Sequence, residues 1–303
     1  MQSASRFLRS LTDVTKVGRE ANKLLHTRFG RRQFNPDGMN VLDEDWDNLI
    51  ILDACRYDHF CEQATLPGRT ERRESIGSAT YHWVRGTFAE RRLHDTVYVG
   101  ANSWFLKLRD EIGAEVHTFV DLQHGGYDVE WVDEELNVVT PETVTRVAKE
   151  VAEQYPDKRL IIHYLQPHHP FIGTAGSAIF RHQSNSLIDV VAEADEATVA
   201  DLREAYRENL SIVLDEVETL LDALRGRTVI TADHGEMLGD RHDFVPTRDY
   251  GHHKGIFNGP TVDVPWHVKE SDTRKEIVAE PPERTAVDMD RVDEQLRELG
   301  YVI

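Results

Sequence analysis

Short hydrophobic runs with a strand-like pattern alternate with segments of helical character along most of this chain. The strand-like runs lie at residues 48–52, 96–100, 115–120, 159–165, 228–232 and 264–268. Helices are expected over residues 141–155, 196–224 and 292–299. Because such alternation is typical of parallel sheets, we expect an α/β fold with helices on both faces of a mostly parallel central sheet. Pro265 lacks a backbone N–H, which favours an edge position for the last strand.

Polar side chains directly follow two of the hydrophobic runs. Asp53 comes after residues 48–52, and Asp233 and His234 come after residues 228–232. Ligands of parallel α/β sheets bind outside the carboxyl ends of the strands. Carboxylate oxygens and an imidazole nitrogen suit a divalent ion such as manganese, zinc or magnesium. The sequence therefore predicts a metal site here, although Asp53 considered alone would also suit a helix cap.

Four motifs resemble those of the sulfatase-like branch of the alkaline phosphatase superfamily. They occur in the expected order, at residues 53–58 (DACRYD), 166–170 (QPHHP), 233–240 (DHGEMLGD) and 251–254 (GHHK). The resemblance covers roughly residues 46–302 and implies an alkaline-phosphatase-like three-layer sandwich. We therefore expect a sulfatase-like catalytic domain over residues 41–303, preceded by a separate N-terminal segment over residues 1–40.

The resemblance also implies a reaction. Members of this group are metal-dependent hydrolases or transferases that act on phosphate or sulfate esters. A threonine or serine at the start of a helix would attack the ester and form a covalent intermediate, which water or another acceptor then releases. A bound metal ion lowers the pKa of such a nucleophile, and the helix N-terminus offers N–H groups to the anionic ester oxygens.

Two departures from the sulfatase pattern favour phosphate esters over sulfate esters. The chain lacks the C/S-x-P-x-R motif whose first residue sulfatases convert to formylglycine, and Ala54 stands where many sulfatases have a second aspartate. With one carboxylate fewer, manganese, zinc or magnesium is favoured over calcium. Two alternatives stay open: a sulfate-ester hydrolase of cell-surface glycans, and a catalytically weak relative that binds an anionic glycan or lipid headgroup.

Residues 77–83 (GSATYHW) resemble the S-x-T stretch that opens the nucleophile helix of phosphotransferase-like members. We expect Thr80 to cap the following helix and to act as the nucleophile, because its hydroxyl would then lie at the positive helix end. Ser78 is the alternative nucleophile, and otherwise a substrate-binding residue. Without the other motifs, both residues would be interpreted as ordinary helix caps.

Several histidines near the motifs are candidates for substrate or metal contact. His168 is expected to contact the ester oxygen or the leaving group, and to act as a general acid, with His169 as the alternative. His252 would complete a metal shell or bind the anion, with His253 as its rival. Lys254 is expected to hold anionic charge of the substrate.

The first 32 residues have a charge pattern of their own. They contain eight lysines and arginines against two acidic residues. Their apolar residues recur at intervals suited to one face of a helix: Phe7, Leu8, Leu11, Val14, Val17, Leu24 and Leu25. Such a basic amphipathic helix can lie on an anionic membrane surface; the alternative is a helix that packs on the acidic body of the protein.

The whole 303-residue chain carries 54 acidic and 35 basic side chains, a formal net charge of −19 that argues against nucleic-acid binding. Only eight of the basic residues are lysines. An acid excess with few lysines predicts a salt-adapted, halophilic protein, because salt screens the repulsion among carboxylates. An ordinary acidic protein is the alternative.

No apolar run of the sequence is long enough to span a bilayer, and its start has no secretory signal pattern. We therefore expect a cytoplasmic protein, loosely attached to the inner membrane face through the basic helix. The substrate class implied by the resemblance is an anionic ester, namely a phosphorylated or sulfated sugar or lipid headgroup. The sequence does not predict the oligomeric state.

Overall fold

A computed structural model describes residues 2–122, 138–180, 186–194, 197–283 and 289–298. Its centre is a seven-stranded sheet with the strand order β2-β9-β6-β1-β5-β3-β4. The strands are β1 (Asn48–Leu52), β2 (Arg69–Glu74), β3 (Arg92–Gly100), β4 (Glu115–Asp121), β5 (Arg159–Tyr164), β6 (Thr228–Thr231) and β9 (Asp263–Lys269). All neighbours from β6 to β4 pair in parallel, whereas β9 is antiparallel to both β6 and β2. The expected mostly parallel sheet is confirmed.

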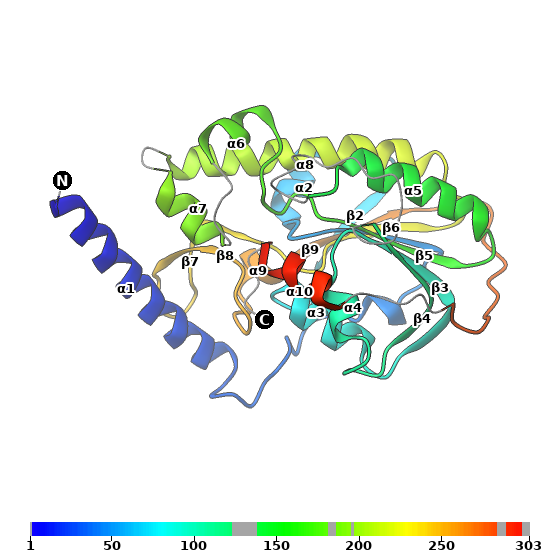
Figure 1. The fold of residues 1–303 in the computed structure, drawn as a ribbon, viewed down its shortest axis with the longest axis horizontal. Coiled ribbons are helices and arrows are strands. Elements are labelled where there is room, and N and C mark those ends of the chain that lie inside the picture. The colour runs from blue at the N-terminus through cyan, green and yellow to red at the C-terminus, as the bar shows by residue number, and fades with distance from the viewer. Residues whose placement is uncertain (1, 123–137, 181–185, 195–196, 284–288, 299–303) are drawn as a thin grey trace.

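Helices cover both faces of this sheet (Figure 1). The α-helices of the described residues are α1 (Gln2–His26), α2 (Tyr57–Gln63), α3 (Thr80–Phe88), α4 (Trp104–Leu108), α5 (Pro141–Gln154), α6 (Thr174–Ile179), α7 (Leu187–Glu193), α8 (Val199–Leu221), α9 (Gly259–Val262) and α10 (Met289–Glu298). The fully buried strand β1 divides its side chains between two cores: Ile50 packs with residues of α5 and α8, and Ile51 packs with residues of α3 and α4. The three-layer α/β sandwich is thus confirmed, and α5, α8 and α10 match the three expected helices.

Strands β1 and β6 lie side by side at the centre of the sheet, and their register places Ile51 opposite Thr231. Both strands run in the same direction, so the chain leaves them at the same edge. Asp53 and Asp233 follow within two residues of these paired positions. The fold therefore brings together two aspartates that are far apart in the sequence.

The position of β9 differs from the prediction. It lies between β2 and β6, and the edge strand next to it is β2, which the hydrophobic pattern did not predict. Strand β2 has the sequence RTERRE and is only partly buried, so it lacks the apolar residues of a core strand. Pro265 is accommodated because β6 pairs only with residues 267–269, beyond the proline.

A second, two-stranded sheet is formed by β7 (Met237–Arg241) and β8 (Arg248–Gly251). Helix α1 lies beside it, away from the main sheet (Figure 1). A Cβ atom at Gly18 would come within 2.4 Å of Thr247, so glycine is what permits the close approach of α1 to the loop between β7 and β8.

The large apolar residues of α1 whose burial the structure describes are exposed rather than packed on the body of the protein: Val14, Val17, Leu24 and Leu25. Val17 is 71% exposed and Leu24 is 50% exposed, whereas the polar Asn22 of the same helix is fully buried. Within the described residues, no helix combines the length and the apolar character needed to cross a bilayer.

Candidate active site

Four side chains converge where β1, β6 and α3 meet. His234 Nε2 lies 3.6 Å from Asp53 Oδ1, 3.3 Å from Asp233 Oδ2 and 3.2 Å from the hydroxyl oxygen of Thr80. All four residues are fully buried. The three predicted metal ligands and the predicted nucleophile thus form one cluster, which we call the Asp53 cluster.

Backbone and amide donors orient the two aspartates. Asp233 Oδ1 accepts hydrogen bonds from the backbone N–H groups of Ala54 (3.1 Å) and His234 (2.9 Å). Asp53 Oδ2 accepts a bond from the side-chain amide of Asn102 (2.9 Å), which follows β3. Each carboxylate therefore has one oxygen that is held by the protein.

The other oxygen of each aspartate suits a metal ion. Asp53 Oδ1 and Asp233 Oδ2 are buried and have no hydrogen-bond partner within the described structure. His234 Nδ1 lies 2.8 Å from the carbonyl oxygen of Gly235; a carbonyl only accepts, so Nδ1 carries the proton and Nε2 offers a lone pair to the cluster. Two carboxylate oxygens, an imidazole nitrogen and a hydroxyl within this small space fit a divalent cation of the zinc or manganese kind.

The electrostatics of the cluster point the same way. Burial, and then the charge of Asp233, raise the pKa of Asp53 well above its usual range. Burial alone would also raise the pKa of Asp233, but His234 and His163 hold it below the usual value. Within the described part of the chain, histidines are the only ion-pairing side chains within 4.0 Å of these two carboxylates. A divalent cation would compensate the buried negative charge.

Thr80 is the first residue of α3, one position further into the helix than the predicted cap position. Ala79 is the N-cap and makes no side-chain capping bond, so the expectation that Thr80 caps the helix is wrong. Its hydroxyl instead lies 3.2 Å from Nε2 of His234, the unprotonated nitrogen that can accept its hydrogen bond. The start of α3 directs backbone N–H groups toward the same region, as an anion site requires.

Ser78 is engaged differently. Its hydroxyl donates to the carbonyl oxygen of His253 (3.0 Å) and accepts from the backbone N–H of Gly255 (3.0 Å). The residue is fully buried. These bonds tie the segment before α3 to the segment after β8, which is a structural role.

A second group of possible metal ligands lies beside the Asp53 cluster. His168, Glu236 and His252 each offer a ligand atom, and these atoms lie within 4.8 Å of one another; we call them the Glu236 cluster. Its His252 ring centre lies 4.2 Å from that of His234, so the two clusters adjoin. His252 Nδ1 donates to Glu236 Oε1 at 3.2 Å.

The pKa values of the two histidines are low. Burial, and then the neighbouring His252, lower the pKa of His168 to about 4; burial, and then His253, lower that of His252 to about 4. Both imidazoles are therefore neutral near pH 7, the form that ligates metal ions. A general-acid role of His168 would need a bound anion to raise its pKa.

Residues of α8 and of the DHGEMLGD motif hold the loops of the site. Asn209 accepts from the N–H of Ile172 (2.8 Å) and donates to the carbonyl of Pro170 (3.0 Å), which fixes the loop that carries His168. Arg56 binds Asp58 with two nitrogens and Asp240 with a third. The first and the third sequence motifs are thus joined by a salt bridge.

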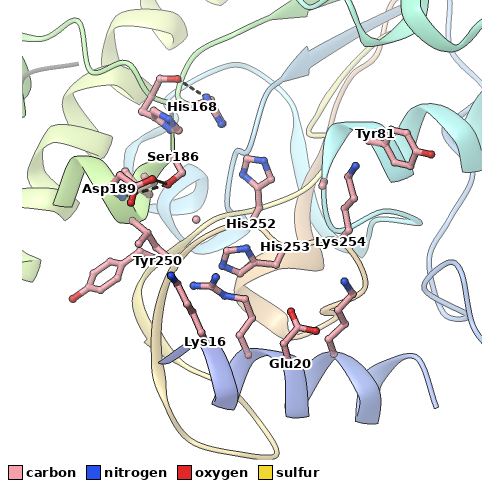
Figure 2. A pocket seen from close by; sticks show the side chains of 17 residues that line it. Lys16, Glu20, Tyr81, His168, Ser186, Asp189, Tyr250, His252, His253 and Lys254 are labelled. Carbon is pink, nitrogen blue, oxygen red and sulfur yellow. Dashed lines mark hydrogen bonds between the residues drawn. The ribbon is translucent and has the colours of Figure 1, made fainter. Parts of the chain in front are cut away.

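A cavity of about 510 Å³ opens in front of these clusters (Figure 2). His168, His252 and Lys254 line it from the body of the protein, and residues 16–23 of α1 contribute another wall. His253 also lines it, but its Nε2 lies 3.3 Å from the buried carboxylate of Asp249. His253 therefore belongs to the contacts that hold α1.

Sequence reasoning missed two residues of the site and underrated a third. Glu236 was visible inside the D-H-G-E motif but was not assigned a role. Asn102 gave no signal, because a single asparagine after a strand is common. His163 lies within the hydrophobic run 159–165, which favours a core position; it bonds the hydroxyl of Tyr98 (2.8 Å), and its Nε2 also lies 3.8 Å from Asp53.

No protein-family model matches the chain, and no curated protein matches it. Among solved structures, it is similar to the integral membrane lipooligosaccharide phosphoethanolamine transferase A from Neisseria meningitidis, with 13% identity, a TM-score of 0.48 and alignment of 74% of this chain with 47% of that one. It is also similar to the C-terminal periplasmic domain of EcEptC from Escherichia coli in complex with zinc (12%, TM-score 0.46, 74% of this chain with 72% of that one).

The chain thus spans about half the length of the first of these proteins. A third similar structure is a protein in the alkaline phosphatase superfamily from Vibrio parahaemolyticus (10%, TM-score 0.46, 88% of this chain with 72% of that one). At these identities and scores the likeness is one of fold and remains distant.

Proposed function

We propose that this protein is a metal-dependent phosphoester hydrolase or phosphoryl-group transferase that works through a covalent intermediate on Thr80. One observation carries the proposal: the Thr80 hydroxyl, the two unbonded carboxylate oxygens and the free nitrogen of His234 meet at the start of α3. A structural threonine would not need two buried carboxylates without cationic partners beside it.

The residues of the Asp53 cluster would hold one divalent ion, and those of the Glu236 cluster would hold a second. When bound, such ions polarise the ester oxygen and lower the pKa of the nucleophile. The donor set of carboxylates, histidines and a hydroxyl supports zinc, manganese or magnesium.

The chain's own groups account for the transfer. The oxygen of Thr80 forms a bond to phosphorus, and the bond from phosphorus to the leaving oxygen breaks. Asp233 is the acceptor for the departing proton, since its Oδ2 and the Thr80 hydroxyl lie 3.3 and 3.2 Å from the same nitrogen of His234. The first N–H groups of α3 bind the anionic phosphoryl oxygens. Attack by water or another acceptor on the phosphothreonine then restores the free hydroxyl.

The test is a panel of phosphomonoesters, phosphodiesters and sulfate esters, assayed with each added metal. We expect turnover of a phosphoester, lost at least about a thousandfold in T80A. T87A is the matched control, because Thr87 is a buried threonine of the same helix outside the cluster, and it should retain turnover.

S78A distinguishes the alternative nucleophile, since it should retain turnover if Thr80 is the nucleophile. Cleavage of sulfate esters alone would overturn the phosphoester assignment. An enzyme that binds metal and anions without turnover of any ester would instead be the catalytically weak binding relative.

A further inference from the structure

Three of the chain's eight lysines line the cavity in front of the proposed active site. Lys16 and Lys23 come from α1, and Lys254 follows β8. Figure 2 shows Lys16 and Lys254 on opposite sides of the cavity. The chain as a whole has a net charge of −19 and few lysines. The three lysines at one cavity therefore set this cavity apart from the acidic remainder of the protein.

Helix α1 is held firmly enough to serve as a wall. Arg19 binds the buried carboxylate of Asp249 with two nitrogens, at 2.8 and 2.6 Å. The buried Asn22 donates to the carbonyl of Val245 (2.9 Å) and accepts from the N–H groups of Phe244 and Val245. These contacts hold α1 on the β7–β8 sheet in one rotational position, in which Lys16 and Lys23 line the cavity.

Lys254 is placed next to the proposed nucleophile. Its ammonium nitrogen lies 3.8 Å from the ring centre of Tyr81, the residue after Thr80, and 5.5 Å from that of Trp104. A Cβ atom on Gly255, the residue after Lys254, would lie 3.6 Å from Cγ and 3.8 Å from Cε of Lys23. The side chain of Lys23 therefore lies beside the backbone that carries Lys254, at the same wall of the cavity.

The three lysines of the cavity have no carboxylate partner among the described residues. Within the described residues, no ion pair within 4.0 Å joins Lys16, Lys23 or Lys254 to an acidic side chain. Lys107 and Lys158, by contrast, are paired with Asp293 and Glu280.

Two acidic residues also line the cavity, and neither is ion-paired with Lys23 or Lys254. Asp189 accepts a bond from the Ser186 hydroxyl (2.6 Å), which it faces across the first turn of α7. Glu20 is exposed on α1 between Lys16 and Lys23 without an ion pair to either. Lys254 lies over the ring of Tyr81, and Lys23 lies beside Gly255, the residue that follows Lys254.

We propose that Lys23 and Lys254 form a second anion subsite, separate from the proposed metal clusters, which selects phosphoester substrates bearing a further anionic group. The inference rests on the proposed function, because it assigns the substrate class of the same cavity. Two ammonium groups that line one cavity, neither ion-paired with a described carboxylate, are stabilised when an anion lies between them. Helix α1 thereby becomes part of the substrate site.

The test compares two substrates that differ by a second phosphate group on the same three-carbon chain: propyl phosphate and 1,3-propanediol bisphosphate. In the metal-loaded wild type, we expect kcat/KM to favour the bisphosphate by about tenfold, mostly through KM, as for a charge-assisted contact. In K23Q this ratio should fall toward one. K149Q, which removes a lysine from α5 far from the cavity, should keep the wild-type ratio. A wild-type ratio near one, or an unchanged ratio in K23Q, would overturn the proposal.

A binding measurement separates this proposal from the proposed function. In the T80A background, calorimetry should show binding of 1,3-propanediol bisphosphate that weakens with K23Q and with K254Q but not with K149Q. If the wild type cleaves no ester, the proposed function fails, yet lysine-dependent binding would still support the subsite. Equal binding by T80A/K23Q and T80A/K149Q would refute the subsite whatever the activity.

Discussion

The hydroxyl oxygen of Thr80 lies 3.2 Å from Nε2 of His234, although the two residues are 154 positions apart in the chain. This contact exists because α3 begins at the edge of the sheet where β1 and β6 end. A hydroxyl at a helix N-terminus lies here beside a histidine whose unprotonated nitrogen faces two carboxylates. Such an arrangement suits proton transfer from the hydroxyl rather than packing.

The two adjoining clusters predict two divalent ions per chain. Wild-type protein saturated with zinc or manganese should carry two ions by native mass spectrometry, and E236Q should carry one. D53N should weaken the remaining site by at least about tenfold, because it removes a buried anionic ligand. D157N, on a half-exposed turn residue, should behave as wild type. Two ions in both E236Q and the wild type would contradict the assignment of the Glu236 cluster.

The anchor between α1 and the body predicts a dependence of stability on pH. Burial alone would raise the pKa of Asp249, but hydrogen bonds from Arg19, His242 and His253 hold it far below the usual value. The ionised carboxylate therefore adds stability above pH about 4, and this contribution is lost as the pH falls toward its folded-state pKa.

We expect D249N to lower the free energy of unfolding by about 3 kcal/mol at pH 7, because it leaves Arg19 without its buried partner. Chemical denaturation at several pH values should show this difference shrink as the pH falls below about 4, because the carboxylate of the unfolded chain becomes protonated there while that of the folded chain stays ionised. A difference that stays constant over that range would mean that Asp249 is not the titrating anchor.

The candidate site was predictable where a residue directly follows a hydrophobic strand. Asp53, Asp233 and His234 could be placed together because parallel strands end at one edge of a sheet. Thr80 was identified through its segment, but its place in the first helical turn depended on backbone geometry. The position of Glu236 could not be predicted, because it depends on the turn after Asp233 that returns the chain toward the loop of His168.

Other parts of the fold left no readable pattern. Strand β2 consists of charged and polar residues, so hydrophobic periodicity could not reveal it, and the edge was assigned to β9 instead. The helical pattern of α1 was readable, but its docking was not. A glycine, an arginine and an asparagine fix the helix, and the large apolar residues described on it, from Val14 to Leu25, are exposed.

That exposed apolar side, together with the basic residues of α1, predicts binding to an anionic lipid surface. Wild-type protein should co-sediment with phosphatidylglycerol vesicles and much less with phosphatidylcholine vesicles. V17D should reduce the bound fraction severalfold, because Val17 is 71% exposed on the helix. V278D, at a residue that is 42% exposed elsewhere, serves as the control. Equal binding of V17D and V278D would remove α1 from the membrane contact.

The acid excess predicts a response to salt. Between about 0.1 M and 1 M KCl the Debye length falls from about 10 Å to about 3 Å, which screens repulsion among exposed carboxylates. The melting temperature of the chain, with its net charge of −19, should therefore rise over this range. A neutral osmolyte at matched water activity should have a smaller effect. A flat or falling melting temperature in KCl would count against salt adaptation.

The covalent intermediate on Thr80 is tested most directly by trapping it. Metal-loaded protein is mixed with the best phosphoester of the panel, quenched in acid within the first turnover and digested for peptide mass spectrometry. We predict one phosphoryl group, located on Thr80, which is absent in T80A and present in T87A. A phosphoryl group on Ser78 or His168, or turnover without any covalent phosphoryl group, would contradict the proposed mechanism.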